Sequence, residues 1–97
     1  MNKQDVLAKL TDSIREIKKR FSVQNLAIFG STARNDAKDT SDIDVLVVFD
    51  QKATFDLFMD LKFYLEDLLG TKVDLVTDKA LRPQIRKEIE KELINVS

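Results

Sequence analysis

The sequence predicts an α/β fold in which a small mixed β-sheet of about three main strands is flanked by helices. Apolar residues recur at three- and four-residue intervals in long segments, and short β-branched runs separate those segments. The two glycines and the single proline fall at the boundaries between them. With 97 residues, the chain has the size of one domain, residues 1–97.

The first half of the chain predicts a long helix followed by a buried strand. Asn2 can cap the helix, and the basic residues 18–20 suit the negative end of its dipole. The apolar stripe of this helix comprises Val6, Leu10, Ile14, Ile17 and Phe21. A short apolar run at 26–29 then stops at Gly30, which indicates a strand that ends there.

The second half predicts two further strands and two further helices. In order, the expected elements are a helical turn at 31–37, a loop at 35–41, a strand at 42–49, a helix at 54–69, a strand at 72–77 and a last helix from Pro83. β-branched residues mark the strand at 42–49. Gly70 suits the C-terminal end of the helix at 54–69. Ile85, Ile89 and Leu93 form one stripe of the last helix.

Composition narrows the possible chemistry. The chain has no cysteine and no histidine, which excludes disulfides, thiolate nucleophiles, imidazole bases and the commonest zinc ligand. Sixteen basic and seventeen acidic residues nearly cancel without a basic stripe, so strong nucleic-acid binding is not expected. The longest apolar run, 45–49, is too short to span a membrane, and no signal peptide is recognised, which predicts a cytoplasmic protein.

Three aspartates lie in or beside predicted strands, where carboxylates are costly. Asp42 and Asp44 are two residues apart and share one face of their strand, and Asp74 interrupts the apolar run of another. Clustered carboxylates without a cation are unfavourable, and all-oxygen ligands suit Mg²⁺ or Mn²⁺. Asp42 alone also fits an ordinary strand-edge aspartate, but the three together predict a metal site.

Gly30 and Ser31 are expected beside these acids. If the first two strands are antiparallel and the third is parallel to the second, Gly30, Asp42 and Asp74 meet at one end of the sheet. Glycine lets a ligand approach the backbone, and amides at a helix N-terminus favour phosphate. This arrangement suits in-line phosphoryl or nucleotidyl transfer, whereas a simple turn and helix cap is the alternative for Gly30 and Ser31.

The spaced motif resembles the signature of the DNA polymerase β nucleotidyltransferase superfamily. It reads Gly30-Ser31-Thr32-Ala33-Arg34, then Ser41-Asp42-Ile43-Asp44-Val45-Leu46-Val47, and continues through residues 69–76 to the last helix. The chain is similar to the minimal nucleotidyltransferases, which include MntA-type antitoxins paired with HEPN-domain toxins. Asn35 departs from the pattern, since members often have glycine there, but asparagine tolerates the left-handed conformation. The resemblance implies a polymerase-β-like fold.

The resemblance also implies a role for each site residue. Asp42 and Asp44 would hold two Mg²⁺ ions, with Mn²⁺ as a substitute. Asp74 would complete one metal site and help to deprotonate the acceptor hydroxyl. The implied nucleotide-binding residues are Gly30, Ser31 and Arg34. Judged without the family, Arg34 is an ordinary surface arginine.

The implied function is transfer of AMP from ATP, or of another NMP from its NTP, to a hydroxyl of a partner protein. In its most concrete form, the chain is an antitoxin that adenylylates a HEPN-domain toxin. The alternatives are a non-catalytic antitoxin that neutralises its partner sterically, and a small-molecule nucleotidyltransferase of the antibiotic-modifying kind. A domain of this size has no segment left to hold an acceptor, so a second copy or another protein is expected to supply that surface.

An apolar stripe on the predicted helix 54–69 indicates an interface. Phe55, Met59 and Phe63 follow one another at four-residue spacing on the side that carries the polar residues Asp56, Asp60, Lys62, Glu66 and Asp67. Their exposure predicts a homo-oligomer seam or a docking surface for a partner. Alternatively, the last helix folds over them. The opposite arc, expected to face the core, comprises Leu57, Phe58, Leu61, Tyr64, Leu65, Leu68 and Leu69.

Overall fold

The computed structural model describes residues 2–36 and 42–96. The elements are α1 (Lys3–Phe21), β1 (Val23–Phe29), α2 (Gly30–Arg34), β2 (Ile43–Phe49), α3 (Phe55–Leu69), β3 (Val73–Thr77), the short 3₁₀ turn η1 (Asp78–Ala80), α4 (Pro83–Glu90) and β4 (Ile94–Val96). The predicted α/β class is confirmed, with four strands rather than about three. Residues 37–41 of the loop predicted at 35–41 lie outside the described residues.

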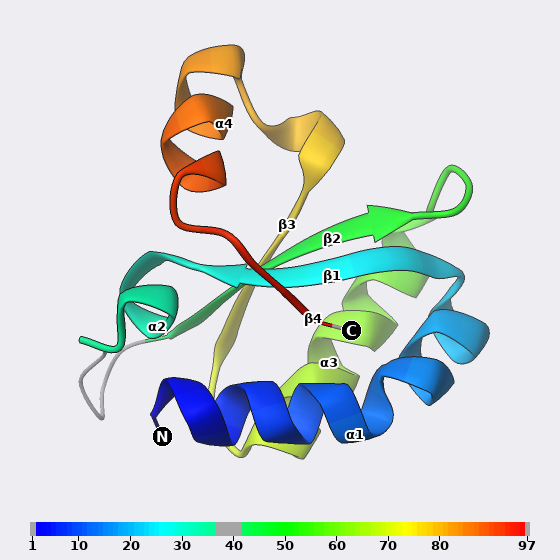
Figure 1. The fold of residues 1–97 in the computed structure, drawn as a ribbon. Coiled ribbons are helices and arrows are strands. Elements are labelled where there is room, and N and C mark those ends of the chain that lie inside the picture. The colour runs from blue at the N-terminus through cyan, green and yellow to red at the C-terminus, as the bar shows by residue number, and fades with distance from the viewer. Residues whose placement is uncertain (1, 37–41, 97) are drawn as a thin grey trace.

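The sheet is mixed and has the strand order β3-β2-β1-β4. β1 pairs antiparallel with both β2 and β4, whereas β2 and β3 are parallel and are connected through α3. Both orientations assumed for the site, antiparallel for the first two strands and parallel for the third, are therefore present. Figure 1 shows β1 and β2 crossing the middle of the molecule, with α2 at one end of β1.

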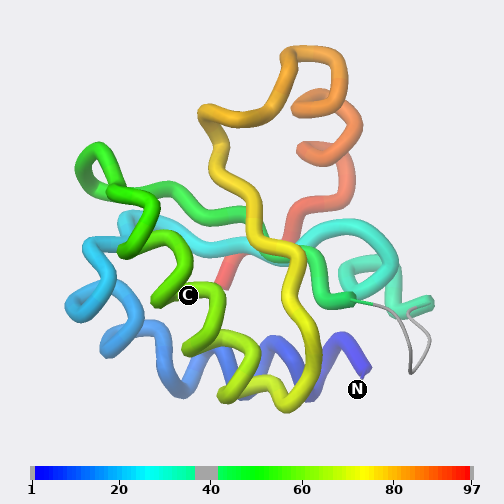
Figure 2. Tube along the Cα trace, turned by 180° about the vertical axis from the view of Figure 1, so that it is seen from behind, coloured from blue at the N-terminus to red at the C-terminus, as the bar shows by residue number. Residues whose placement is uncertain are grey.

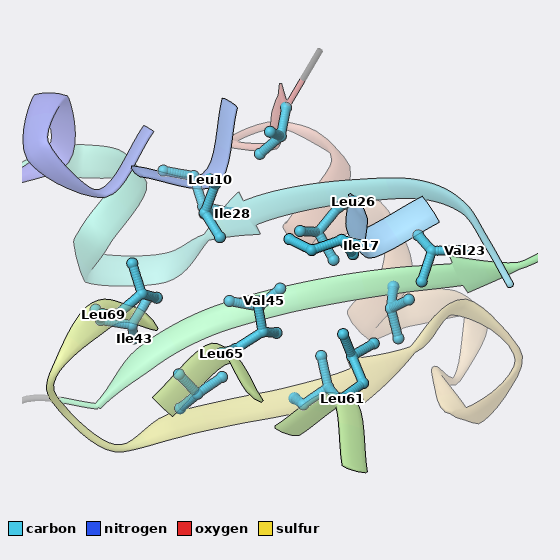
Figure 3. Packing of buried hydrophobic residues seen from close by; sticks show 14 of the residues in the cluster. Leu10, Ile17, Val23, Leu26, Ile28, Ile43, Val45, Leu61, Leu65 and Leu69 are labelled. Atoms are coloured by element: carbon cyan, nitrogen blue, oxygen red, sulfur yellow. The ribbon is translucent and has the colours of Figure 1, made fainter. Parts of the chain in front are cut away.

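The two faces of the sheet are covered differently. α1 and α3 lie together on one face, and α4 lies on the other (Figure 1). The core fills the space between the sheet and the helices α1 and α3. Figure 3 shows part of it, with Leu10, Ile17, Leu26, Ile28, Val45, Leu61 and Leu65. The arc of α3 predicted to face the core does so, with Leu61, Leu65 and Leu69 fully buried. Among the described residues, no helix is both long and apolar enough to cross a bilayer.

The caps of the two long helices agree with the prediction. The Asn2 side chain accepts a hydrogen bond from the Asp5 backbone N–H at 2.8 Å, which caps α1. Thr54 caps α3 in the same way, with its hydroxyl 3.1 Å from the Leu57 nitrogen. Gly70 closes α3 in the left-handed conformation, with φ of 70°.

The last predicted helix is shorter than expected, because its predicted stripe extends to Leu93. α4 begins at Pro83 as expected but ends at Glu90, and Ile94–Val96 forms β4 instead. β4 pairs with the free edge of β1 and satisfies backbone groups that solvent would otherwise have to satisfy. The predicted apolar stripe of this helix is buried only in part, because Ile89 is buried but Ile85 is 51% exposed.

Truncation of Leu65 should test the packing of α3 on the sheet. The side chain is completely buried, so Leu65→Ala should lower the free energy of unfolding by about 2–5 kcal/mol. Ile85→Ala is the control, because that side chain is half exposed and should change stability by less than about 0.5 kcal/mol. Urea denaturation of both variants measures the difference, and equal effects would contradict the core described above.

Candidate active site

The end of β1 brings the backbone of Gly30 against the carboxyl group of Asp44. Phe29, the last residue of β1, lies opposite Asp44 in the antiparallel register, and Gly30 then begins α2 with φ of 67°. A Cβ atom at Gly30 would lie 3.1 Å from the Cγ of Asp44 and closer still to its Oδ2. The positive φ therefore favours glycine here, and a side chain at this position would displace the Asp44 carboxyl group.

Asp44 and Asp74 lie side by side on neighbouring strands. They are register partners in the parallel β2–β3 pair, where strands lie about 4.8 Å apart. Ile43 and Val45 point into the core beneath α1 and α3, so Asp44 points to the opposite face, and Asp74 follows the same alternation. Asp42 is exposed just before β2, two residues from Asp44. The structure thus brings these acids to one end of one sheet face.

Electrostatic strain is concentrated on Asp44. The pKa of its carboxyl group is raised from 3.8 to about 6, chiefly by burial and then by the negative charges of Asp74 and Asp42. The positive charge of Arg34 opposes this shift only in part. Two neighbouring negative charges therefore act on a half-buried carboxylate, and a cation at this position would relieve the repulsion.

The chemistry of the donor set fits a hard divalent cation. Asp42, Asp44 and Asp74 offer only carboxylate oxygens, which are the ligands that Mg²⁺ and Mn²⁺ prefer. Within residues 2–36 and 42–96, no three acidic side chains converge closely enough to form a complete metal site. The residues therefore fit a metal in charge and ligand type, and metal binding itself stays a prediction.

Arg34 links α2 to the C-terminal segment. Its guanidinium donates hydrogen bonds to Glu92 at 2.7 Å and to Asp36 at 3.3 Å. These two partners, Glu92 first, raise the pKa of Arg34 above its ordinary value. The charge of Arg34 still acts on Asp44, so Arg34 belongs to the electrostatic environment of the site. Its predicted contact with a triphosphate stays a prediction.

The conformation of α2 follows from residues at its two ends. Asn35 ends the helix with φ of 61°, so the expected tolerance of asparagine for the left-handed conformation is confirmed. The Asn35 Oδ1 accepts a hydrogen bond from the Lys3 backbone N–H at 3.1 Å, which fixes α2 to the start of α1. Ser31 is half-buried at the first turn, beside Gly30. Of this segment, Gly30 lies beside the Asp44 carboxyl group, and phosphate binding by Ser31 stays a prediction.

Sequence reasoning missed one residue that positions the site. Glu66 was expected on the solvated side of its helix, but it is half-buried, and its Oε2 accepts a hydrogen bond from the Val73 backbone N–H at 3.0 Å. This bond fixes the start of β3, one residue before Asp74. A signal was available, because an acid in the last turn of a helix opposes the helix dipole and needs a local donor.

Comparison with known proteins identifies the class. The family profile described as "Nucleotidyltransferase domain" matches residues 10–96. A relative from Methanocaldococcus jannaschii, provisionally named a protein adenylyltransferase, is 43% identical over 95 residues, covering 93% of this chain and 97% of its own. Protein adenylyltransferase MntA of Thermococcus cleftensis is 38% identical over 93 residues, covering 96% and 94%. The chain therefore belongs to the nucleotidyltransferase domain family.

Solved structures place the chain within this family. A structure described as a minimal nucleotidyltransferase matches with a TM-score of 0.83 and 33% identity, covering 97% of this chain and 95% of its own. A toxin–antitoxin structure with AMP-PNP matches at 0.74 and 19% identity, covering 90% and 72%. A complex of tri-AMPylated Shewanella oneidensis HEPN toxin with MNT antitoxin matches at 0.68 and 17%, covering 94% and 71%. The last two show the fold alone, and the predicted resemblance to MntA-type minimal nucleotidyltransferases is confirmed.

Alanine at Gly30 should disturb the site more than alanine at Gly70. Both glycines have positive φ, so each substitution should cost about 1–2 kcal/mol of stability. Only at Gly30 does the new Cβ collide with Asp44, because nothing lies within 4 Å of a Cβ at Gly70. Gly30→Ala should therefore also weaken nucleotide binding by calorimetry, and equal binding by the two variants would contradict this geometry.

Neutralising Asp44 should stabilise the metal-free protein at neutral pH. The folded carboxyl has a pKa of about 6, against 3.8 in the unfolded chain, so the folded state binds the proton more tightly. This group therefore lowers the free energy of unfolding as pH rises from about 4 to about 6, and the loss persists above that range. In EDTA, Asp44→Asn should melt above the wild type at about pH 7.5 and converge with it near pH 4. A wild type that melts higher at neutral pH would contradict the repulsion described for Asp44.

Proposed function

We propose that this chain is a Mg²⁺-dependent protein adenylyltransferase, which moves AMP from ATP to a hydroxyl group of a partner protein. The observation that carries the proposal is the pairing of Asp44 with Asp74 beside Gly30, where β1 passes into α2. Membership of the nucleotidyltransferase family supports the reaction class. Relatives named as protein adenylyltransferases support a protein as acceptor.

Each site residue has a separate role in this proposal. Asp42 and Asp44 would hold the metal ions, and Asp74 would complete one of the two sites. Bound Mg²⁺ would supply positive charge that offsets the acids and the triphosphate together. The backbone of Gly30 and the hydroxyl of Ser31 bind the β- and γ-phosphates at the start of α2. The sixth site residue is Arg34, whose guanidinium contributes charge toward the triphosphate.

The proposed reaction is an in-line displacement at the α-phosphorus. The acceptor oxygen forms a bond to that phosphorus while the bond to the oxygen bridging the α- and β-phosphates breaks, and pyrophosphate leaves. Asp74, an exposed carboxylate beside the reacting atoms, takes the proton from the acceptor hydroxyl. The protein contributes chiefly orientation and a fixed arrangement of charges, since no residue forms a covalent intermediate.

The acceptor is proposed to be a HEPN-domain toxin, modified at a tyrosine hydroxyl. Structural neighbours support this choice, because one was solved with AMP-PNP and another with a tri-AMPylated HEPN toxin. The described residues form one sheet with its helices, and this proposal takes the acceptor surface from the partner protein. A toxin–antitoxin pair of this kind, with ATP as its substrate, would act in the cytoplasm.

Label transfer tests the proposal directly. The chain is incubated with α-labelled ATP, Mg²⁺ and a HEPN-domain partner, and label is expected on the partner in Mg²⁺ but not in EDTA. Asp44→Asn should abolish transfer, whereas Asp12→Asn, an exposed acid on α1, should leave it unchanged. A partner that is neutralised without becoming labelled would instead establish a steric antitoxin. Label on a small molecule alone would contradict a protein acceptor.

Asp74→Asn should separate chemistry from nucleotide binding. Asp42 and Asp44 still hold the triphosphate-bound metal in this variant, so the affinity for ATP should stay within about tenfold of the wild type. Transfer should fall by at least about a hundredfold, because the hydroxyl loses its proton acceptor. Calorimetry and single-turnover label transfer measure the two quantities. Near-normal transfer by Asp74→Asn would show that another group takes the proton.

A further inference from the structure

An apolar stripe runs along the outer side of α3. Phe55 is 76% exposed and Phe63 is 54% exposed, with the half-buried Met59 between them at four-residue spacing. The last helix does not cover this stripe, because α4 lies on the opposite face of the sheet (Figures 1 and 2). Large exposed apolar side chains in a row are typical of a protein–protein interface.

The stripe faces away from the candidate active site. α3 packs its buried leucines on the sheet face opposite Asp44 and Asp74, and the stripe lies on the solvent side of that helix. An acceptor docked on the stripe would be separated from the acids by α3 and the whole sheet. A second copy docked there would leave both sites open to nucleotide and acceptor. The location therefore favours a second copy over an acceptor.

A groove beside the stripe carries charges of both signs. It has a volume of about 520 Å³, lies between the end of α1 and α3, and has Phe63 in its lining. The Arg20 guanidinium on the α1 side lies 5.4 Å from the ring centroid of Tyr64, which is half-buried against the core. Asp60 and Asp67 line the α3 side. The lining thus combines an aromatic floor with one basic and two acidic side chains, and among the described residues that line the groove Arg20 is the only one that could pair with an incoming acid.

We propose that the stripe is the seam of a homodimer with two-fold symmetry. A two-fold axis beside Met59 brings Phe55 of each copy onto Phe63 of the other, because each phenylalanine lies four residues from Met59. Phe55 then enters the groove of the second copy. Asp56 comes directly after Phe55 and lies one helical turn before Asp60, which lines the groove, so this seam places Asp56 opposite the other copy's Arg20. The projecting Phe55 and the groove that receives it lie on the same surface of each copy, as a closed two-fold interface requires.

Sedimentation velocity over a micromolar concentration series tests this seam. The wild type should form a dimer, and Phe55→Glu or Phe63→Glu should weaken dimerisation by at least about tenfold. Both positions are exposed, so circular dichroism should show folded monomers. Ile85→Glu is the matched control, because Ile85 is also a half-exposed apolar residue but lies on α4, and it should leave the dimer intact. A wild type that stays monomeric, or a control that dissociates equally, would overturn the proposal.

Charge reversal tests the proposed pairing of Asp56 with Arg20 across the seam. Arg20→Glu and Asp56→Arg should each weaken the dimer, and the double variant should restore it, because the pair is reversed rather than lost. Failure of the double variant to dimerise would overturn this register. Stripe variants that stay dimeric but no longer label a partner would overturn the homodimer seam and identify the stripe as an acceptor surface.

Discussion

The candidate site depends on the packing that holds two carboxylates, Asp44 and Asp74, next to each other on parallel strands. Their repulsion is visible in the pKa of Asp44, which burial and its acidic neighbours raise to about 6. The strands cannot slide to relieve it, because a shift of one residue would turn the acids into the core and expose the apolar side chains that alternate with them. Ile43 and Val45 on β2, and Val73 and Leu75 on β3, are all buried beneath α1 and α3. Hydrophobic packing on one face thus fixes the charges on the other.

Local contacts then define the surroundings of this pair. Gly30 has no side chain, which leaves room for the Asp44 carboxyl and brings backbone beside it. Glu66 holds the first residue of β3 through its bond to the Val73 nitrogen. Arg34 connects α2 to Glu92 near the C-terminus. The site is therefore built both from contacts close in sequence, such as Glu66 with Val73, and from distant ones, such as Arg34 with Glu92.

The parts of this arrangement that follow a local pattern could be predicted from the sequence. Alternation along one strand predicts that Asp42 and Asp44 share a face, and the caps at Asn2 and Gly70 depend only on nearby residues. β4 could not be predicted, because three residues carry no strand signal and the pairing partner is an edge created by the fold. The ion pair between Arg34 and Glu92 was missed for the same reason, since 58 positions separate them.

The two faces of the sheet have different roles in this small domain. The face under α1 and α3 provides the core, and it also places the exposed stripe of α3 on the far side from the acids. On the other face, α4 lies over Leu46 and Val48, where a cavity of about 140 Å³ separates helix from sheet. Asp74 and Asp42 stay exposed beyond this cover. In the proposed reaction, nucleotide and acceptor would therefore approach the acids from the same uncovered side of the sheet.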